Sequence, residues 1–524
     1  MNGNGVAIAE VTSGFTSILY NRKELEPRQE DVAPQPEFFH DLNLDQVVSS
    51  LTKGREEFGL ESFLYAPVSD LACLTFRHEV MQDLQASPIF DAVKAFTEGI
   101  QQVKRYAAVY SKAYYPEEGR RWRLDSADLY SEAVEAFVET LRTSQPNSVG
   151  LKAFLQYSTG YLQSQPYQML RAEVKGIKAD LSGIRFGLLL GEGRITVKRY
   201  EEQPDYTEVV SKAFAKFQQD STKEYRMRLS EPSGMNHIEA MILERVKKLF
   251  PDVFARLDTF CRRHPTYIDP IVERFFREIQ FYMAYLDYIA PLQEKGLHFC
   301  YPEISASLKC VANSDGFDLA LASKMIANAG PVVTNSFYLR EGERMFVVSG
   351  PNQGGKTTFA RAFGQTHYLA SLGLPIPGRK AQIFLCDRIF THFEHEEKLA
   401  TLRGKLQDDL VRIHDILKRA TPRSLIIINE IFSSTSEADA VYLGTQILQR
   451  IDALDALCVC VTFLDELSLL SHKIVSMVAA VDPSDPAVRT FHLDRRPADG
   501  LAHAMAIARK YRLAYADILE RLHA

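Results

Sequence analysis

The sequence predicts a multidomain protein in which a region of long helices, carrying a small β-containing insertion, precedes an α/β domain. Apolar residues recur at intervals of three and four through most of the first 300 residues, which is typical of amphipathic helices. Two β-prone runs interrupt that periodicity near residue 184. From about residue 301, short apolar runs alternate with helical segments. A chain of 524 residues is also too long for one hydrophobic core, so about two to four domains are expected.

The composition is that of a globular protein without a dominant charge. The chain has 61 basic and 67 acidic residues and a net charge of −6, so any nucleic-acid surface must be local. No uninterrupted apolar run reaches the ~18 residues of a membrane span, and no membrane partner is expected. The seven cysteines lack zinc-ligand spacing and favour a reducing compartment, the cytoplasm. Cys458 and Cys460, two apart in an apolar run, are expected to be buried on one face.

The first 300 residues divide into four segments. Residues 1–35 carry Gly, Ser, Pro and mixed charge, which is typical of a loose arm. Residues 36–180 and 235–300 hold the helical periodicity, as in "FDAVKAFTEGIQQVKRYAAVY" and "VERFFREIQFYMAYLDYIAPLQEKG". Between them, residues 181–234 contain "IRFGLLLGEGRITVKRYEE", two β-prone runs that predict a hairpin turning at "GEG".

Two stretches of this region could contact nucleic acid. The segment "QQVKRYAAVYSKAYYPEEGRRWR" combines six basic residues with four tyrosines and the only tryptophan. The favoured interpretation is structural: a helix with Tyr106, Val109 and Tyr110 facing the core, then a loop at Pro116 with solvated arginines. The predicted hairpin carries further candidates, with acidic neighbours that make solvated loops an equal alternative. These DNA-contact candidates are Arg194, Lys198 and Arg199.

Residues 301–524 form the predicted α/β domain. Its apolar runs are "RMFVVS", "AQIFLCD", "SLIIIN", "LCVCVTF" and "KIVSMVAAV". Strands that are apolar throughout and separated by helices indicate a sheet buried on both faces.

A phosphate-binding loop follows the first run of this series. "GPNQGGKT", from Gly350 to Thr357, fits G-x-x-x-x-G-K-[ST] between a predicted strand and a predicted helix. Glycines let successive backbone N–H groups point at phosphate oxygens, the lysine reaches the β- and γ-phosphates, and the threonine hydroxyl binds Mg²⁺. The strand and helix on either side disfavour the alternative, a glycine-rich turn with a surface lysine. The nucleotide-binding candidates of this loop are Gly350, Pro351, Asn352, Gln353, Gly354, Gly355, Lys356, Thr357 and Thr358.

The acidic partner of the loop is expected at the end of "SLIIINEIF". Asn429 stands where a magnesium-binding Asp is usual, and as a neutral side chain it is the weaker ligand. Glu430 is placed to orient or deprotonate the attacking water, and it is the catalytic candidate. The alternative is a solvent-facing carboxylate at a strand end. ATP and Mg²⁺ are therefore the expected ligands, with Thr357 and Asn429 at the metal, partly through water.

Three stretches resemble the DNA mismatch-repair MutS family. "SGPNQGGKTTFARAF" is similar to its "TGPNMGGKST", and "CDRIFTHF" resembles its "DRIFTR". "ILKRATPRSLIIINEIFSSTSEADA" resembles its "ILHNAT…DEIGRGTSTYDG" block. The likeness covers residues 301 to about 515. Upstream, "SFLYAPVSDLACLTFRHEVMQDL" looks like the start of the family's helical core, and the insertion lies where the family carries a DNA clamp between lever helices.

The resemblance implies an ABC-type P-loop ATPase that forms a homodimer with nucleotide between subunits. It assigns Asn335 to the nucleotide site, just past the adenine-contacting positions, here Val332 and Val333. It also assigns two loops that reach across the dimer, and the residues concerned are Thr401, Gly404, Ser434, Thr435 and Ser436. Nothing before the helical core is long enough for the family's mismatch-reading domain. Phe463 stands where the family has a switch histidine, and with Asn429 this predicts slow ATP hydrolysis.

Together these observations predict a cytoplasmic, ATP-dependent DNA-binding ATPase of the MutS type, acting in DNA repair or recombination. The alternative is a nucleotide-dependent switch that binds protein partners and makes little or no contact with DNA, which the acidic net charge favours.

Overall fold

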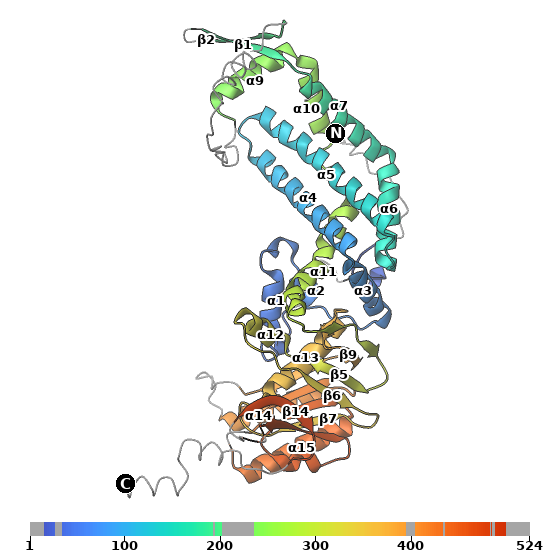
Figure 1. Ribbon diagram of the computed structural model, residues 1–524, viewed down its shortest axis with the longest axis vertical. Coiled ribbons are helices and arrows are strands. Elements are labelled where there is room, and N and C mark those ends of the chain that lie inside the picture. Colours follow the sequence, from blue (N-terminus) through green and yellow to red (C-terminus); the bar gives the residue numbers. More distant parts are fainter. Residues whose placement is uncertain are drawn as a thin grey trace, which may run out of the picture. The chain divides into compact units, whose positions relative to one another are not determined.

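The computed structural model describes residues 15–26, 34–191, 194–201, 235–394, 404–432, 435–482, 484 and 488–498. It is helix-rich with mixed sheets, and its chain falls into two compact units (Figure 1). Unit 1 consists of Met1–Phe15, Asp83–Asn147 and Leu151–Phe276. Unit 2 consists of Thr16–Gln82, Ser148–Gly150 and Arg277–Ala524. The start of the expected helical region, residues 36–82, thus groups with the C-terminal half of the chain.

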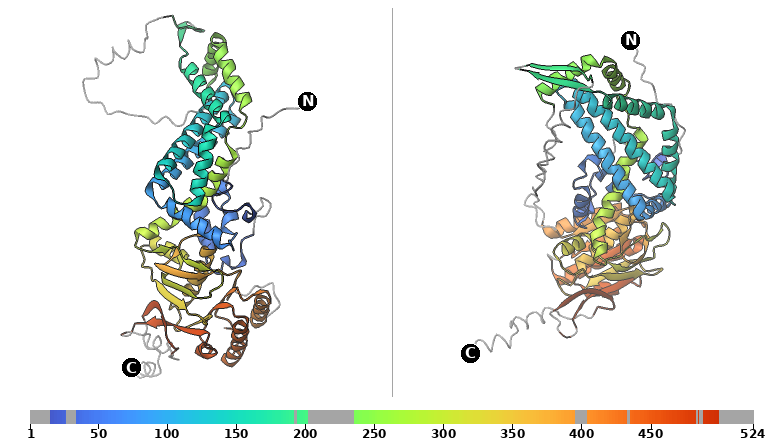
Figure 2. Two further views of the ribbon diagram at one scale, coloured as in Figure 1. Left: turned by 90° about the vertical axis from the view of Figure 1, so that its right-hand side faces the viewer. Right: turned by 45° about the horizontal axis from the view of Figure 1, so that its top comes forward.

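Unit 1 is built around long helices. The two longest, α4 (Ser87–Lys112) and α5 (Pro116–Ser144), pack along one another, and α7 (Gln165–Ser182) and α10 (Pro251–Arg263) pack on α5 (Figures 1 and 2). Proline in the first turn starts α4, α5, α7 and α10, where the missing N–H costs no hydrogen bond. A capping box of Asn236 and Glu239 starts α9 (His237–Leu249). Helices α3 (Leu71–Leu84), α6 (Val149–Gln163) and α11 (Pro270–Glu294) contain residues of both units.

The basic and aromatic stretch in α4 and α5 corrects the sequence interpretation. Pro116 opens α5 instead of lying in a loop, and Val109 is 44% exposed instead of facing the core. Tyr106 packs on Trp122 with ring centroids 4.8 Å apart, and Arg123 donates to the Tyr110 hydroxyl at 3.0 Å. Arg121 forms an ion pair with Asp125 at 2.7 Å. Contacts between α4 and α5, and an ion pair within α5, therefore engage these side chains.

The predicted hairpin forms from β1 (Phe186–Gly191) and β2 (Arg194–Arg199), paired antiparallel from Phe186 opposite Arg199 to Gly191 opposite Arg194. Arg199 donates to the carbonyl oxygen of Leu249 at 2.8 Å and lies over the Phe250 ring, which fastens the hairpin to α9. The rest of the expected insertion, residues 202–234, lies outside the described residues.

Unit 2 contains a six-stranded sheet in the order β10-β11-β12-β7-β13-β14. Its strands are β7 (Met345–Ser349), β10 (Ile389–Phe393), β11 (Leu425–Asn429), β12 (Leu457–Val461), β13 (Ile474–Val481) and β14 (Arg489–Arg495). The first five in spatial order run parallel, and β14 pairs antiparallel with β13. The carboxyl ends of β7, β11 and β12 therefore meet at one edge of the sheet.

A second, four-stranded sheet has the order β4-β9-β5-β6. It comprises β4 (Glu303–Ser305), β5 (Val311–Gly316), β6 (Asn335–Leu339) and β9 (Lys380–Phe384), and a short pair joins β3 (Phe299–Cys300) to β8 (Ile376–Pro377). The run "AQIFLCD" thus contributes β9 to this mixed sheet and not to the parallel one. Periodicity cannot make that distinction, because a strand's own residues do not specify its neighbour.

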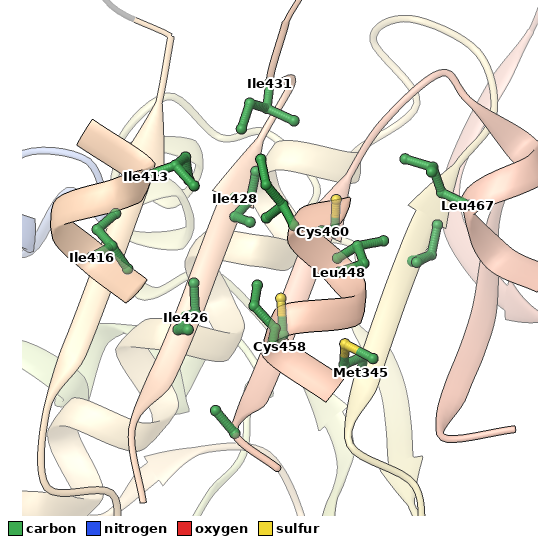
Figure 3. Close-up of a cluster of buried hydrophobic side chains, with 14 of the residues drawn as sticks. Met345, Ile413, Ile416, Ile426, Ile428, Ile431, Leu448, Cys458, Cys460 and Leu467 are labelled. Carbon is green, nitrogen blue, oxygen red and sulfur yellow. The ribbon is translucent and has the colours of Figure 1, made fainter. Parts of the chain in front are cut away.

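Helices α13 (Lys356–Ser371), α14 (Lys405–Arg419) and α15 (Glu437–Leu454) cover the large sheet, and α1 (Leu44–Thr52) packs against α12 (Leu319–Ala327). Figure 3 shows the core on one face, where Ile426 and Ile428 of β11 meet Ile413 and Ile416 of α14 and Leu448 of α15.

The strand β12 contributes two buried thiols to the same core. Cys458 is 0% and Cys460 is 1% exposed, as their spacing predicted. Burial raises the pKa of the Cys460 thiol to about 12, so this thiol stays protonated and unreactive at neutral pH. Within the described part of the chain, no helix combines the length and the apolar character that crossing a membrane requires.

Candidate nucleotide-binding site

The glycine-rich loop connects β7 to α13 at the edge where the parallel strands end. Gly350 has φ +110° and Gly355 has φ +93°, a backbone region that side chains with a Cβ rarely adopt. A Cβ added at Gly350 would lie 3.0 Å from the Ala479 nitrogen, and one at Gly354 would lie 2.9 Å from the Ala479 Cβ. The loop needs glycine at these positions because it turns left-handed and packs directly on β13.

Lys356 begins α13 and folds back over this loop. Its ammonium nitrogen Nζ donates to the carbonyl oxygens of Gly350 at 2.8 Å and Pro351 at 3.2 Å, and the residue is 4% exposed. Burial lowers the pKa of Lys356 to about 8, although the charge of Glu430 opposes that shift. The Nζ atom also lies 4.0 Å from the centroid of the Phe463 ring, a contact that the sequence did not reveal.

Thr357 and Asn429 join the loop to the end of β11. The Thr357 hydroxyl donates to Asn429 Oδ1 at 2.9 Å, so two uncharged oxygens lie side by side where the helix begins. Both residues come from elements that the sequence placed correctly. Asn429 is 9% exposed and lies in register with Val461 of β12.

Glu430 is the next residue, and its backbone leaves the extended conformation. It has φ +55°, an uncommon value for a residue with a Cβ, while its N–H still donates to the Val461 carbonyl oxygen at 2.9 Å. This turn brings Glu430 to the wall of a cavity beside the loop. Burial raises the pKa of Glu430, the charge of Lys356 opposes the shift, and the charge of Glu394 adds to it.

The cavity has a volume of about 420 Å³ and is lined by both polar and apolar residues. Its polar lining consists of Gln353–Thr358, Glu430, Asp318 and Asn335. Its apolar wall consists of Leu321, Met325, Pro331, Val332, Val333 and Phe491. A pocket of this size that combines a glycine-rich loop at a helix N-terminus with apolar side chains suits a nucleotide. Gly350, Pro351 and Asn352 belong to the loop but do not line this cavity.

Sequence reasoning missed the aromatic residue of the apolar wall. Phe491 comes from β14, more than 150 residues after Val332 and Val333, and its φ of +61° marks an unusual turn in that strand. Asn335 holds it in place: its side-chain Nδ2 donates to the Phe491 carbonyl oxygen at 3.1 Å, and its Oδ1 accepts from the Leu493 N–H at 2.8 Å. No local pattern around Phe491 indicates this role.

Of the residues assigned to the cross-dimer loops, the three that the structure describes, Gly404, Thr435 and Ser436, do not line the cavity. Gly404 precedes α14 as its N-terminal cap, and Ser436 caps α15 by accepting from the Asp439 N–H at 3.2 Å. The Thr435 N–H donates to the Phe432 carbonyl oxygen at 3.4 Å. Thr401 and Ser434 lie outside the described residues. Contacts to a second copy stay a prediction for all five positions.

Histidine and glutamate residues gather at the end of β10 and just after it, in the run "HFEHEEK". His392 is buried and pairs with Asp409 of α14 at 3.2 Å, and Glu394 pairs with Lys405. His395 and Glu396 lie outside the described residues. Among the residues that the structure describes, no group of three or more His, Cys, Asp and Glu side chains could hold a metal ion.

Comparison with known proteins finds a family match for the segment that contains the glycine-rich loop and Glu430. Residues 346–505 match the family MutS domain V. A segment of 197 residues is 30% identical to the endonuclease MutS2 of Gemmatimonas aurantiaca, covering 37% of this chain and 24% of that protein. A segment of 221 residues is 27% identical to the DNA mismatch repair protein MutS of Shouchella clausii, covering 38% and 25% respectively. For the DNA mismatch repair protein MutS of Microcystis aeruginosa the identity is 28% over 238 residues, covering 44% and 26%. The matched part therefore spans about a quarter of these relatives.

Proposed function

Because the chain belongs to the MutS family, we propose that it is an ATP-dependent, DNA-binding ATPase that acts in DNA repair or recombination. The observation that carries the proposal is the cavity of about 420 Å³, which is lined by the glycine-rich loop, by Glu430 and by an apolar wall. The adenine ring would lie against Phe491, Val332 and Val333. The phosphates would lie against the backbone N–H groups of the loop and the N-terminus of α13, whose dipole favours anions.

Magnesium is the metal that the donor set fits. Thr357 Oγ1 and Asn429 Oδ1, 2.9 Å apart, are the hard oxygen ligands that Mg²⁺ prefers, and these residues would hold it partly through water. When bound, Mg²⁺ neutralises charge on the phosphate oxygens. Asn429 contributes no charge of its own, so the metal is held more weakly than by a carboxylate.

Glu430 would orient the water that attacks the terminal phosphate and accept its proton. Its carboxyl reaches the cavity because of the left-handed turn at φ +55°, and its N–H bond to Val461 keeps that turn in place. With a neutral Asn429 and an apolar Phe463 beside the lysine, we propose that hydrolysis is slow and that ATP serves mainly to switch conformation. Closure would bring two copies together as a homodimer around the nucleotide.

Nucleotide binding and turnover test the enzymatic part. We expect the purified protein to bind ATP, and the Lys356→Ala variant to lose at least about tenfold in affinity because it lacks the ammonium. The Glu430→Gln variant should keep ATP affinity and lose hydrolysis. Full affinity in Lys356→Ala, or a turnover near 10 per second in the unmodified protein, would contradict the proposal.

DNA contact is proposed for the hairpin of unit 1. Arg194 and Lys198 are exposed there, whereas Arg199 is engaged with Leu249 and Phe250. The double variant Arg194→Glu/Lys198→Glu should weaken duplex binding and flatten its dependence on salt concentration, because phosphate contacts release counterions. Equal DNA affinity and salt dependence in both proteins would remove the hairpin from the DNA interface.

A second function is favoured by the apolar side chains of the same hairpin. Leu188, Leu189 and Ile195 are between 43% and 45% exposed, and a phosphate backbone offers such groups nothing to bury against. A nucleotide-dependent switch that binds a protein partner would use them. The binding of this protein to duplex, branched and single-stranded DNA, measured with and without ATP at several salt concentrations, distinguishes the DNA-binding function from the protein-binding switch. ATP-independent, negligible affinity for all three probes would favour the protein switch.

A further inference from the structure

Phe463 is held rigidly at the end of β12 although its ring is half exposed. The N–H of the preceding Thr462 donates to the Val348 carbonyl oxygen at 3.0 Å, and the Thr462 hydroxyl accepts from the Leu464 N–H at 3.0 Å. These bonds fix the backbone on both sides of residue 463. Phe463 is 49% exposed, and its ring centroid lies 4.0 Å from the Lys356 ammonium nitrogen.

The Lys356 ammonium is contacted by the Phe463 ring as well as by two backbone carbonyl oxygens. An ammonium has three N–H donors, and two of them are used by the carbonyl oxygens of Gly350 and Pro351. The Phe463 ring, 4.0 Å from Nζ, lies beside the same group and offers the negative face of its π-system. Lys356 is only 4% exposed, but it lines the cavity, so a phosphate oxygen that approaches Nζ competes with the two carbonyl oxygens and the ring.

The other phosphate-binding groups are held independently of the lysine. The backbone of the loop is held open by its left-handed glycines and by packing on Ala479, and Thr357 is positioned by Asn429. Backbone N–H groups of such a loop cradle the α- and β-phosphates, whereas the lysine reaches the β- and γ-phosphates. With the lysine in place, a diphosphate therefore forgoes one lysine contact, at its β-phosphate, whereas a triphosphate forgoes the contacts of both its β- and its γ-phosphate.

We propose that Phe463 is a specificity-determining residue that latches Lys356 away from the terminal phosphate, so the site prefers a nucleoside diphosphate to a triphosphate. This inference rests on the proposed function, because it requires nucleotide at the glycine-rich loop. A phosphate oxygen beside the ring face gains no hydrogen-bond donor and meets the negative side of the ring quadrupole. Release of the latch is then part of the energetic cost of triphosphate binding.

The test compares dissociation constants for ADP and for a non-hydrolysable ATP analogue, both with Mg²⁺, by calorimetry. The unmodified protein should bind ADP more tightly. In Phe463→Ala the ratio should shift toward the triphosphate by roughly threefold to thirtyfold, the range of a cation–π contact from partly exposed to desolvated. Phe463→Leu keeps apolar bulk without the π-face, and we expect it to behave like Phe463→Ala.

Phe491→Ala is the matched control. Phe491 is also a half-exposed phenylalanine, 47% exposed, but it belongs to the apolar wall of the cavity. Its loss should weaken both nucleotides equally and leave their ratio unchanged. An unchanged ratio in Phe463→Ala, or a Phe463→Leu variant that matches the unmodified protein, overturns the latch.

Failure of the latch and failure of the proposed function give different results. If the unmodified protein binds neither nucleotide, or if Lys356→Ala binds both as well as the parent, the nucleotide site itself is wrong. If the parent binds nucleotide and Lys356→Ala does not, while the Phe463 variants keep the parent's ratio, only the latch is wrong.

Discussion

The side chain of Asn335 donates a hydrogen bond of 3.1 Å to the carbonyl oxygen of Phe491 and so ties the four-stranded sheet to the end of the six-stranded one. Its Oδ1 accepts from Leu493 as well, at 2.8 Å. This amide therefore links Phe491, the wall residue that comes from β14, to the start of β6, which follows Val332 and Val333. In the family resemblance Asn335 belongs to the nucleotide site, and the structure offers a physical reason: it positions the aromatic residue.

Replacing Asn335 by Ala should weaken nucleotide binding without touching the phosphates. Both hydrogen bonds are lost, each of about 1 kcal/mol, and Phe491 is free to leave the wall. We expect roughly a tenfold lower affinity for a fluorescent ADP analogue, with similar losses for ATP and ADP. An Asn335→Ala protein with parental affinity for both would show that the wall does not need this amide.

Gly350→Ala and Gly354→Ala should each abolish tight nucleotide binding while the fold persists. At Gly350 the new Cβ meets Ala479 at 3.0–3.2 Å in a backbone with φ +110°, so the loop must change shape. Strain of about 1–3 kcal/mol predicts at least about a tenfold loss of affinity. Gly191→Ala, in the hairpin of unit 1, is the control, because the nearest atom to a Cβ there is the Arg194 carbonyl oxygen at 4.0 Å. Calorimetric titration with ADP compares the three, and parental binding by Gly350→Ala would refute the steric argument.

Asn429→Asp should strengthen magnesium binding. The substitution keeps an oxygen beside the Thr357 hydroxyl, 2.9 Å away in the parent, and adds the charge that a hard cation favours. We expect the Mg²⁺ concentration for half-maximal ATP hydrolysis to fall by about tenfold. Thr357→Val, which removes the hydroxyl, should raise it. No change in the Mg²⁺ dependence of Asn429→Asp would place the metal elsewhere.

Asp455 should contribute to stability through ion pairs far along the strands from the nucleotide. It caps α15 and accepts from Lys309 at 2.8 Å, Arg344 at 3.0 Å and Lys473 at 3.2 Å. Burial opposes ionisation of Asp455, but these three cations outweigh it and lower its pKa to about 2. The lowered pKa means that the contribution is complete above about pH 4, the ordinary range for Asp, and disappears as the pH falls toward 2.

Asp455→Asn should therefore lower the free energy of unfolding at pH 7 by about 1 kcal/mol, a value that allows for solvent screening of a partly exposed group. Urea unfolding of the two proteins from pH 7 to pH 2 measures the difference, which should shrink between pH 4 and pH 2. Nucleotide affinity should not change. Arg344, which pairs with Asp455, lies just before the start of β7, whereas the glycine-rich loop follows the other end of that strand. A difference independent of pH would exclude the ion pairs as its source.

Local sequence predicted those features whose physics is local. The strand, glycine-rich loop and helix from Met345 to Ser371 follow from one motif, because phosphate cradling demands glycine, lysine and threonine in that order. The hairpin of residues 186–199 follows from two β-prone runs and a turn, and burial of Cys458 and Cys460 follows from an apolar strand. The loop expected at Pro116 was wrong because proline is common both in loops and in the first turn of a helix. Packing between α4 and α5 decided in favour of the helix.

The sequence by itself determined features carried by neighbouring residues. These are the glycine-rich loop, the Asn429–Glu430 strand end and the resemblance to the MutS family. Only the tertiary structure brought Phe491 to the apolar wall, Phe463 over Lys356 and Glu430 into the cavity. Each of those contacts joins residues from separate strands through sheet order and an unusual backbone turn. Periodicity and motif spacing describe a segment along the chain, whereas such contacts depend on which strands become neighbours in the folded sheet.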